Sequence, residues 1–389
     1  MKFLQLKFYI IAQLLTATSL FGIPLYAIGV LIRIKSFFRQ KIYLHELVWI
    51  YTAVFYFLCH GLIFSNSLIA NRTLIFIILF IFLSICIINS FKKKKEIILV
   101  FYKTVLIFSG LFCLYGIYEV TMGPLGFPDF FHIFRNNTTF VESYDTPDGT
   151  RQFLRGGWTG TFQIRANGFY SEPSHAAPII LVLIAGIYFS KNSFNKLSIF
   201  LIVSLYVGYS LSRTNWLLTF VGFGIIFLPI IIQKLFLLII FISGIYGLYI
   251  MQNYVSDYDL SILERLSSTY SGLKIWSEHP FFGIGSVELE ATINELTFGT
   301  DAHTTIIHSG IVNIMASNGL IGLFLIYGNL RNLFKRLQNM DFTIFLLVLS
   351  ITMIAHFFYQ ILIFPAYYTV IIALILKSAV INEDKEIYK

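Results

Sequence analysis

Apolar stretches long enough to cross a lipid bilayer recur along this chain and are separated by short polar breaks. Of the 389 residues, 57% are hydrophobic and only 12% are charged, so the chain has too little polar surface to cover a soluble globule. The sequence therefore predicts an all-α polytopic integral membrane protein with about 11–12 transmembrane helices. We treat residues 1–389 as a single transmembrane domain.

The expected spans fall into two groups on either side of a long polar stretch. They lie at roughly 3–32, 44–64, 73–91 and 97–119, and then at roughly 174–190, 197–211, 215–232, 235–251, 306–328, 342–363 and 365–380. The first run contains Gly22 and Pro24, and two interpretations of it stay open. One tilted helix gives a total of about eleven spans, whereas a helix broken at these residues gives about twelve.

Two polar stretches, 120–167 and 252–305, are predicted to be large loops on the outer side of the membrane. The short connectors between the other spans and the C-terminal tail hold most of the 28 lysines and arginines. Short loops rich in these residues tend to stay on the cytoplasmic side. This distribution explains the net charge of +8 without nucleic acid, and no nucleic-acid partner is predicted.

Two histidines, His303 and His308, stand at the beginning of the span expected near 306–328. Histidine is the side chain best suited to move a proton near neutral pH. The unpaired N–H groups of a first helical turn disfavour the imidazolium ion, so a ring placed there is held neutral, as a base must be. We predict a catalytic base at the outer face, with His308 preferred and His303 as the alternative.

Three arginines, Arg165, Arg213 and Arg265, are expected on the outer face, against the usual distribution of charge. A guanidinium group matches phosphate oxygens with paired hydrogen bonds and keeps its charge, so these residues are candidate ligands of a polyanion. For Arg165 the alternative is an ion pair with a loop carboxylate. For Arg213 it is a side chain that only reaches up to the membrane interface.

Glu172 directly precedes Pro173, which begins the next apolar run, so its carboxylate is expected at a helix start near the interface. Two roles stay open for it. The charge either complements the helix dipole or belongs to a catalytic or sugar-binding group.

No metal or cofactor is predicted. Cys59, Cys86 and Cys113 lie inside apolar runs, without the spacing of a zinc site. The Asp257-Tyr258-Asp259 triplet is a weak pattern that fits a solvated loop better than a divalent metal site.

Four short motifs in this order resemble the O-antigen ligase and polymerase superfamily, and the chain is most similar to the O-antigen polymerases of the Wzy type. The motifs are Arg165-x-x-Gly168-x-x-x-Glu172-Pro173, Leu211-Ser212-Arg213, Pro280-x-x-Gly283-x-Gly285, and His308 followed by Gly319-Leu320-Ile321-Gly322. The chain departs from the family pattern after the histidine, where it has Ser309 instead of a residue such as asparagine.

The resemblance implies a metal-independent, inverting glycosyltransferase in the bacterial inner membrane, with its active site facing the periplasm. It would polymerise undecaprenyl-diphosphate-linked repeat units into O-antigen or a related surface polysaccharide, as part of lipopolysaccharide biosynthesis. By family logic, Arg165, Arg213 and Arg265 bind the diphosphate, and His308 acts on the acceptor hydroxyl. The resemblance also implies contact with membrane lipid and a chain-length-regulating membrane protein as a partner.

Two other functions stay open. The ligase of the same superfamily transfers finished glycan to a lipid A core, and the pattern from Arg165 to Pro173 favours the polymerase over it. A flippase for lipid-linked sugars also has many spans and buried arginines. Transporters tend to show matching halves with broken helices, and this sequence shows no such internal repeat.

Overall fold

The structure is a computed structural model of the whole chain, and most of what it describes is helical. It describes residues 2–15, 19–20, 23–24, 43–67, 70–91, 94–122, 125, 154–156, 162–164, 166, 168, 173–229, 232–233, 260–297, 306–335, 341–358 and 365–387. The longer helices are α1 (Lys2–Leu14), α3 (Leu44–Ser65), α4 (Arg72–Phe91), α5 (Lys95–Met122), α7 (Ala177–Phe189), α8 (Ser193–Ser210), α9 (Arg213–Phe227), α11 (Leu260–Glu278), α12 (Ser286–Thr297), α13 (Gly310–Phe334), α14 (Phe342–Phe358) and α15 (Pro365–Ile387).

Four of the described helices, α3, α4, α5 and α13, are long and apolar enough to cross a membrane by length and composition. Shorter apolar stretches lie in α7, α9, α14 and α15. The predicted class, an all-α polytopic membrane protein, is confirmed. The predicted span at 235–251 and the Asp257–Asp259 triplet lie outside the described residues.

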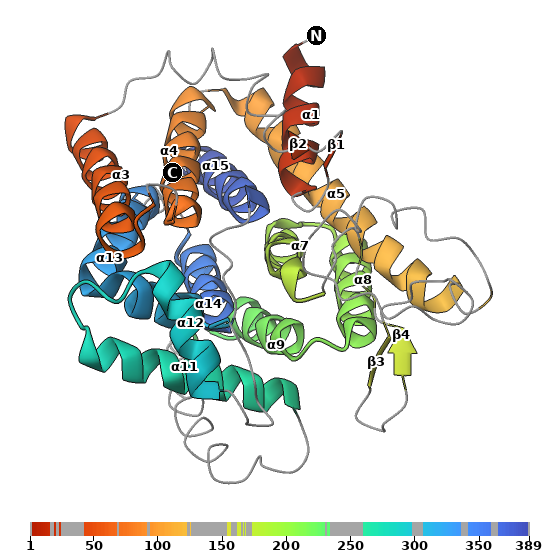
Figure 1. Cartoon of the computed structure of the whole chain (residues 1–389). Helices are drawn as coiled ribbons and strands as arrows, with labels where there is room; N and C mark the ends of the chain where they lie inside the picture. The colour runs from red at the N-terminus through yellow and green to blue at the C-terminus, as the bar shows by residue number, and fades with distance from the viewer. Residues whose placement is uncertain are drawn as a thin grey trace.

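Helix α7 is the centre of the bundle. Its sequence is apolar on every side, as expected for a helix that is buried all round, and Ala177 to Ile187 are all buried. Figure 1 shows it surrounded by α5, α8, α9, α14 and α15, and each of these helices contacts it. One continuous apolar core joins these helices to α1, α3, α4 and α13.

The beginning of the chain differs from one of the two interpretations of the first run. Helix α1 ends at Leu14, and two short strands follow it, β1 (Ser19–Leu20) and β2 (Ile23–Pro24). They pair antiparallel, with Leu20 opposite Ile23, so the chain reverses direction there. The run 3–32 is therefore not one continuous helix.

The two predicted loops contain structure of their own. In the first, β3 (Leu154–Gly156) pairs antiparallel with β4 (Phe162–Ile164). The second contains two helices, α11 and α12. Figure 1 shows α11 and α12 at one side of the bundle, and both contact α13. A small apolar cluster joins Ile275 of α11, Leu289 and Ile293 of α12 and Val312 of α13.

Because successive helices run in opposite directions, α3, α5, α8 and α14 finish at the same end of the bundle at which α4, α7, α9, α13 and α15 begin. We call this the loop end, since both predicted large loops connect to it. At the opposite end, the backbone N–H of Asp341 before α14 donates to Ser378 Oγ near the end of α15, at 3.1 Å. Among the predicted site residues that the structure describes, Arg213 begins α9 and His308 lies two residues before α13, both at the loop end.

Candidate active site

Helix α13 is broken at Gly319, and a turn from another part of the chain fills the break. Gly319 has φ 64° and ψ −168°, which is not helical, so the turns on either side lack their normal backbone partners. The backbone of the 280–285 turn, between α11 and α12, supplies them. The bonds are Ile284 N to Ala316 O (3.1 Å), Gly285 N to Ser317 O (2.9 Å), Leu320 N to Pro280 O (2.9 Å) and Ile321 N to Phe281 O (3.3 Å). Such pairing is needed wherever non-helical backbone lies at membrane depth.

The glycines of the third and fourth sequence motifs allow this contact. Gly283, Gly285 and Gly319 all have positive φ. A Cβ on Gly283 would lie 2.5 Å from Ala316 O, and a Cβ on Gly319 would overlap the carbonyl group of Phe281. These motif residues therefore hold the 280–285 turn against α13, and they act through the backbone.

A set of buried and half-buried polar side chains from α3 and the α3–α4 connection fixes the same turn. His60 Nε2 lies 2.7 Å from Phe282 O, and because a carbonyl can only accept, the ring donates from Nε2. Its Nδ1 accepts from Asn71 Nδ2 at 3.2 Å. Tyr56 donates its hydroxyl hydrogen to Asn318 O at 2.9 Å, next to the break. Sequence reasoning missed these residues, although a polar side chain inside an apolar run is a recognised signal of function.

His308 lies just outside α13. The helix begins at Gly310 with Ser309 as its N-cap, whose Oγ accepts from Val312 N at 3.4 Å. The residue after His308 in the family pattern thus has a defined role here, since serine is among the preferred N-cap residues. His308 itself is half-buried, and the preceding Ile307 is buried in the small apolar cluster with α11 and α12. The prediction that His308 stands at a helix start is confirmed.

Arg265 lies on the face of α11 that packs against the start of α13. A Cβ on Gly272 would be 2.6 Å from Ile307 Cδ1 and 2.7 Å from Val312 Cγ1, so the two segments touch there. Arg265 is seven residues earlier on the same helix face, about 10 Å along the axis. Its side chain is half-buried. The fold therefore brings Arg265 and His308 to the same side of α11.

Arg213 is the first residue of α9 and is exposed. The turn before it is held by serine hydroxyls. Ser212 caps the helix by accepting from Asn215 N at 3.4 Å, and Ser210 Oγ accepts from both Ser212 N and Asn215 Nδ2 at 3.4 Å. The Leu211-Ser212-Arg213 motif thus encodes a tight turn that places the arginine at the loop end.

The segment of the first motif is anchored on that same turn. Ala166 N donates to Tyr209 O at 3.1 Å, and Gly168 N donates to Glu119 Oε2 at 2.8 Å. Gly168 has φ +65°, and a Cβ there would lie 2.5 Å from the Phe112 ring of α5. The residue next to Arg165 in the chain is therefore bound to the last turn of α8, which leads into the turn before Arg213.

Three of the six predicted site residues, Arg165, Glu172 and His303, lie outside the described residues. The residue after Glu172, Pro173, begins the short helix η2 (Pro173–Ala176), which contacts α9. The other three stand at the loop end, on α9, on α11 and beside α13. Helix α14 contacts both α9, which begins at Arg213, and α13, which begins two residues after His308.

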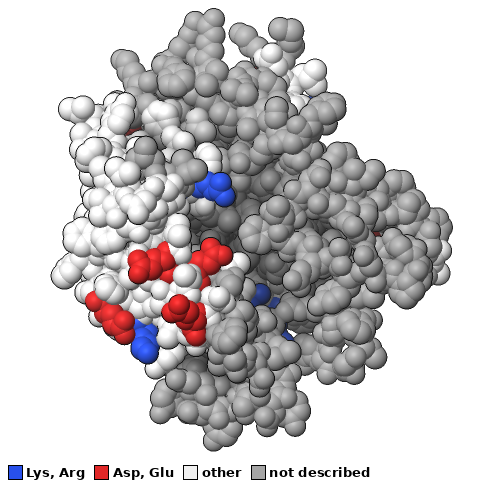
Figure 2. Space-filling view, in the orientation of Figure 1, with Lys and Arg blue, Asp and Glu red and all other residues white. Residues whose placement is uncertain are grey.

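The charges at the loop end are unevenly distributed. Figure 2 shows a few basic side chains exposed near the centre of one face. Figure 2 shows acidic side chains gathered over α11 and α12, where Glu278, Glu288, Glu290 and Glu295 are exposed. Within the described ranges, no group of three or more His, Cys, Asp or Glu residues is arranged to hold a metal ion.

Comparison with known proteins finds one family. Residues 178–327 match the family model described as O-antigen ligase, and no curated protein matches the chain. The matched region begins in α7 and ends in α13, and it contains Arg213, Arg265 and His308 together with the glycines of the α13 break. This match over residues 178–327 supports the resemblance to the O-antigen ligase and polymerase superfamily seen in the motifs.

Proposed function

We propose that this protein polymerises undecaprenyl-diphosphate-linked oligosaccharide repeat units into O-antigen or a related surface polysaccharide. The observation that carries the proposal is the placement of Arg213, Arg265 and His308 at one end of the helix bundle. Each lies in or beside the first turns of a helix, and each is accessible: Arg213 is exposed, and Arg265 and His308 are half-buried. Lipid-linked phosphates lie at the depth of helix ends, so cations and a base there meet the diphosphate and the reacting sugar together.

The reaction joins two lipid-linked glycans. The hydroxyl oxygen of the acceptor sugar attacks the anomeric carbon of the donor and forms the new glycosidic bond. The bond from that carbon to the diphosphate oxygen breaks, and undecaprenyl diphosphate leaves with the electron pair. Attack from the face opposite the leaving group inverts the anomeric centre.

Each residue has a role that its chemistry supports. His308 takes the proton of the attacking hydroxyl, a contribution of about 10²- to 10⁴-fold in rate for a positioned base. Arg213, Arg265 and Arg165 stabilise the charge that gathers on the departing diphosphate, and preorganised guanidinium groups do this without a metal. Glu172 and His303 stay as further candidates, the first for a catalytic or sugar-binding role and the second as the alternative base.

A second candidate is the ligase reaction, because the matched family model is described as O-antigen ligase. The donor and the base would be the same. Only the acceptor differs, since a ligase uses a sugar of the lipid A core in place of a second lipid-linked repeat unit.

A reconstitution separates these functions. The purified protein in detergent is given one synthetic undecaprenyl-diphosphate-linked repeat unit, with a chelator present and no nucleotide sugar, and the products are separated on a gel. We expect a ladder of multiples that His308→Ala abolishes. Transfer only after a lipid A core acceptor is added would establish the ligase instead.

The control for this experiment is His279→Ala, which removes an exposed histidine near the 280–285 turn and should leave the ladder unchanged. A normal ladder from His308→Ala would refute the role of His308 as the base. Movement of the lipid-linked sugar across vesicles without any new glycosidic bond would replace both enzyme functions with transport. Co-purification tests the proposed chain-length-regulating partner.

A further inference from the structure

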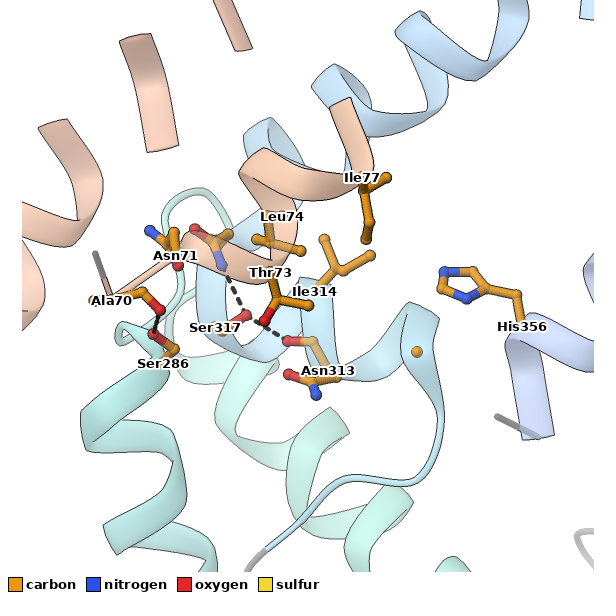
Figure 3. Close-up of a pocket in the computed structure, with 12 residues that line it drawn as sticks. Ala70, Asn71, Thr73, Leu74, Ile77, Ser286, Asn313, Ile314, Ser317 and His356 are labelled. Atoms are coloured by element: carbon orange, nitrogen blue, oxygen red, sulfur yellow. Dashed lines mark hydrogen bonds between the residues drawn. The ribbon is translucent and has the colours of Figure 1, made fainter. Parts of the chain in front are cut away.

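A polar cavity of about 140 Å³ lies at the loop end, beside the start of α13. It is bounded by the α3–α4 connection and the first turns of α4, by the beginning of α12, by the first half of α13 and by the end of α14 (Figure 3). Its lining is made of Ala70, Asn71, Thr73, Leu74, Ile77, Ser286, Gly310, Asn313, Ile314, Ser317, Asn318 and His356. Thr73 is exposed and marks the side on which the cavity opens.

The amide of Asn71 has a fixed orientation in this wall. Its Nδ2 donates to Phe57 O at 3.1 Å and to His60 Nδ1 at 3.2 Å. The nitrogen therefore points away from the cavity toward α3, and Oδ1 is the atom left for a ligand. Asn71 is only 2% exposed, and its Oδ1 has no hydrogen-bond partner within the described part of the chain.

The amide of Asn318 is oriented by a chain of hydrogen bonds along α13. Ser317 Oγ donates its hydrogen to Asn313 O at 2.6 Å, so it can only accept from Asn318 Nδ2 at 2.8 Å (Figure 3). Oδ1 of Asn318 is then the free acceptor. Asn318 is fully buried, and this oxygen also lacks a partner among the residues that the structure describes.

The lining selects for a neutral ligand that donates hydrogen bonds. It contains no lysine or arginine in the described ranges, so the cavity does not fit a diphosphate. Two buried amide oxygens without donors each cost free energy unless a hydroxyl or water donates to them. A closed cavity of about 150 Å³ holds a ring the size of benzene, so this one, which opens beside Thr73, has room for one edge of a sugar ring and the hydroxyls on it.

The position of the cavity relative to His308 indicates whether it would bind the acceptor sugar or the donor sugar. Gly310, two residues after His308, lines the cavity, so the cavity adjoins the segment that carries the candidate base. The base takes its proton from the acceptor, and the acceptor sugar must lie beside it. The donor sugar is tied to the diphosphate, which needs the arginines.

We propose that this cavity binds the terminal sugar ring of the acceptor glycan, with ring hydroxyls donating to Asn71 Oδ1 and Asn318 Oδ1. The inference rests on the proposed function and holds for both of its forms. The ring belongs to a lipid-linked repeat unit in a polymerase and to a lipid A core in a ligase.

The test uses one variant that removes an acceptor atom and one that closes the opening. Asn318→Leu replaces the amide by an apolar side chain of similar size, and Thr73→Trp puts a large side chain at the open side. Thr52→Trp, at an exposed threonine of α3 that does not line the cavity, is the matched control. The two measurements are initial rates against acceptor and donor concentration, and equilibrium binding of radiolabelled repeat-unit glycan released from its lipid.

We expect Asn318→Leu to raise the KM for the acceptor by about 3- to 10-fold, the effect of one lost neutral hydrogen bond. Thr73→Trp should abolish binding of the free glycan. The KM for the donor and the midpoint of thermal unfolding should stay unchanged with Thr73→Trp, and the control should match the wild type in every measurement.

An unchanged acceptor KM and unchanged glycan binding with Thr73→Trp would overturn the proposal, because a blocked subsite cannot bind. If the wild type forms no glycosidic bond with either acceptor, the proposed function falls, and the binding measurement still decides on the cavity. Glycan binding that Thr73→Trp removes supports the subsite in that case, and no binding by the wild type refutes it.

Discussion

The Gly319→Ala substitution is expected to separate the 280–285 turn from α13. The backbone at φ 64° and ψ −168° is essentially restricted to glycine, and a residue with a Cβ pays about 1–3 kcal/mol there. The new Cβ would also overlap the carbonyl group of Phe281, so the turn must move. This movement breaks the bonds from Leu320 N and Ile321 N, and a buried unsatisfied donor costs about 1–3 kcal/mol each. The total is about 3–9 kcal/mol, against a typical free energy of unfolding of about 5–15 kcal/mol.

The loss of stability can be followed by thermal unfolding in detergent with a thiol-reactive dye. Cys86 and Cys113 are fully buried, so their reaction with the dye reports the opening of the bundle. Gly208→Ala is the matched control, because a Cβ on this glycine of α8 meets nothing within 4 Å. It should be neutral or stabilise by about 0.5–1 kcal/mol. An unfolding midpoint for Gly319→Ala equal to that of the wild type would refute the role of the hydrogen bonds between the 280–285 turn and α13 in stability.

Three further outcomes are expected. Arg213→Ala should abolish polymer formation in the reconstituted reaction. Arg213→Lys keeps the charge without the guanidinium fork and should retain a measurable fraction of the activity. Equal rates of polymer formation for the two variants would contradict a role of Arg213 in binding phosphate. Glu119→Gln keeps an acceptor for Gly168 N and should leave most of the activity, whereas Glu119→Ala should lower it strongly, and a fully active alanine variant would show that the anchor is dispensable. His60→Phe leaves the Phe282 carbonyl without its donor and should destabilise the protein by about 1–3 kcal/mol in the same dye assay; an unchanged unfolding midpoint would count against the contact.

The membrane architecture could be predicted from the sequence because it follows from the lengths of the apolar runs. The expected spans at 44–64, 73–91 and 97–119 agree with α3, α4 and α5 to within a few residues. The helix start beside His308 and the turn before Arg213 were also predictable, since serine and the change from polar to apolar residues mark them. The first run was harder, because a tight antiparallel turn at Leu20 and Ile23 leaves little trace in hydropathy.

The break in α13 could not be predicted from the sequence. Asn318-Gly319 is a dipeptide found in turns, but the apolar residues on both sides of it also fit one continuous membrane span. What decides its conformation is the 280–285 turn, which is distant along the chain. The cavity escaped prediction for a similar reason, since Asn71, Ser286 and Asn318 come from three segments and only the fold brings them together.

The contact between the 280–285 turn and the break in α13 has a consequence for biosynthesis. Tyr56 and His60 leave the ribosome long before their partners, which follow 262 and 222 residues later in the chain. Contacts so far apart in sequence form slowly, because the intervening chain must first be inserted. Until α13 enters the membrane, α3 carries these polar groups without the turn that satisfies them. The closing of the turn on Gly319 is therefore expected to be a late step in maturation, and quality-control proteases would meet variants of the motif glycines at that stage.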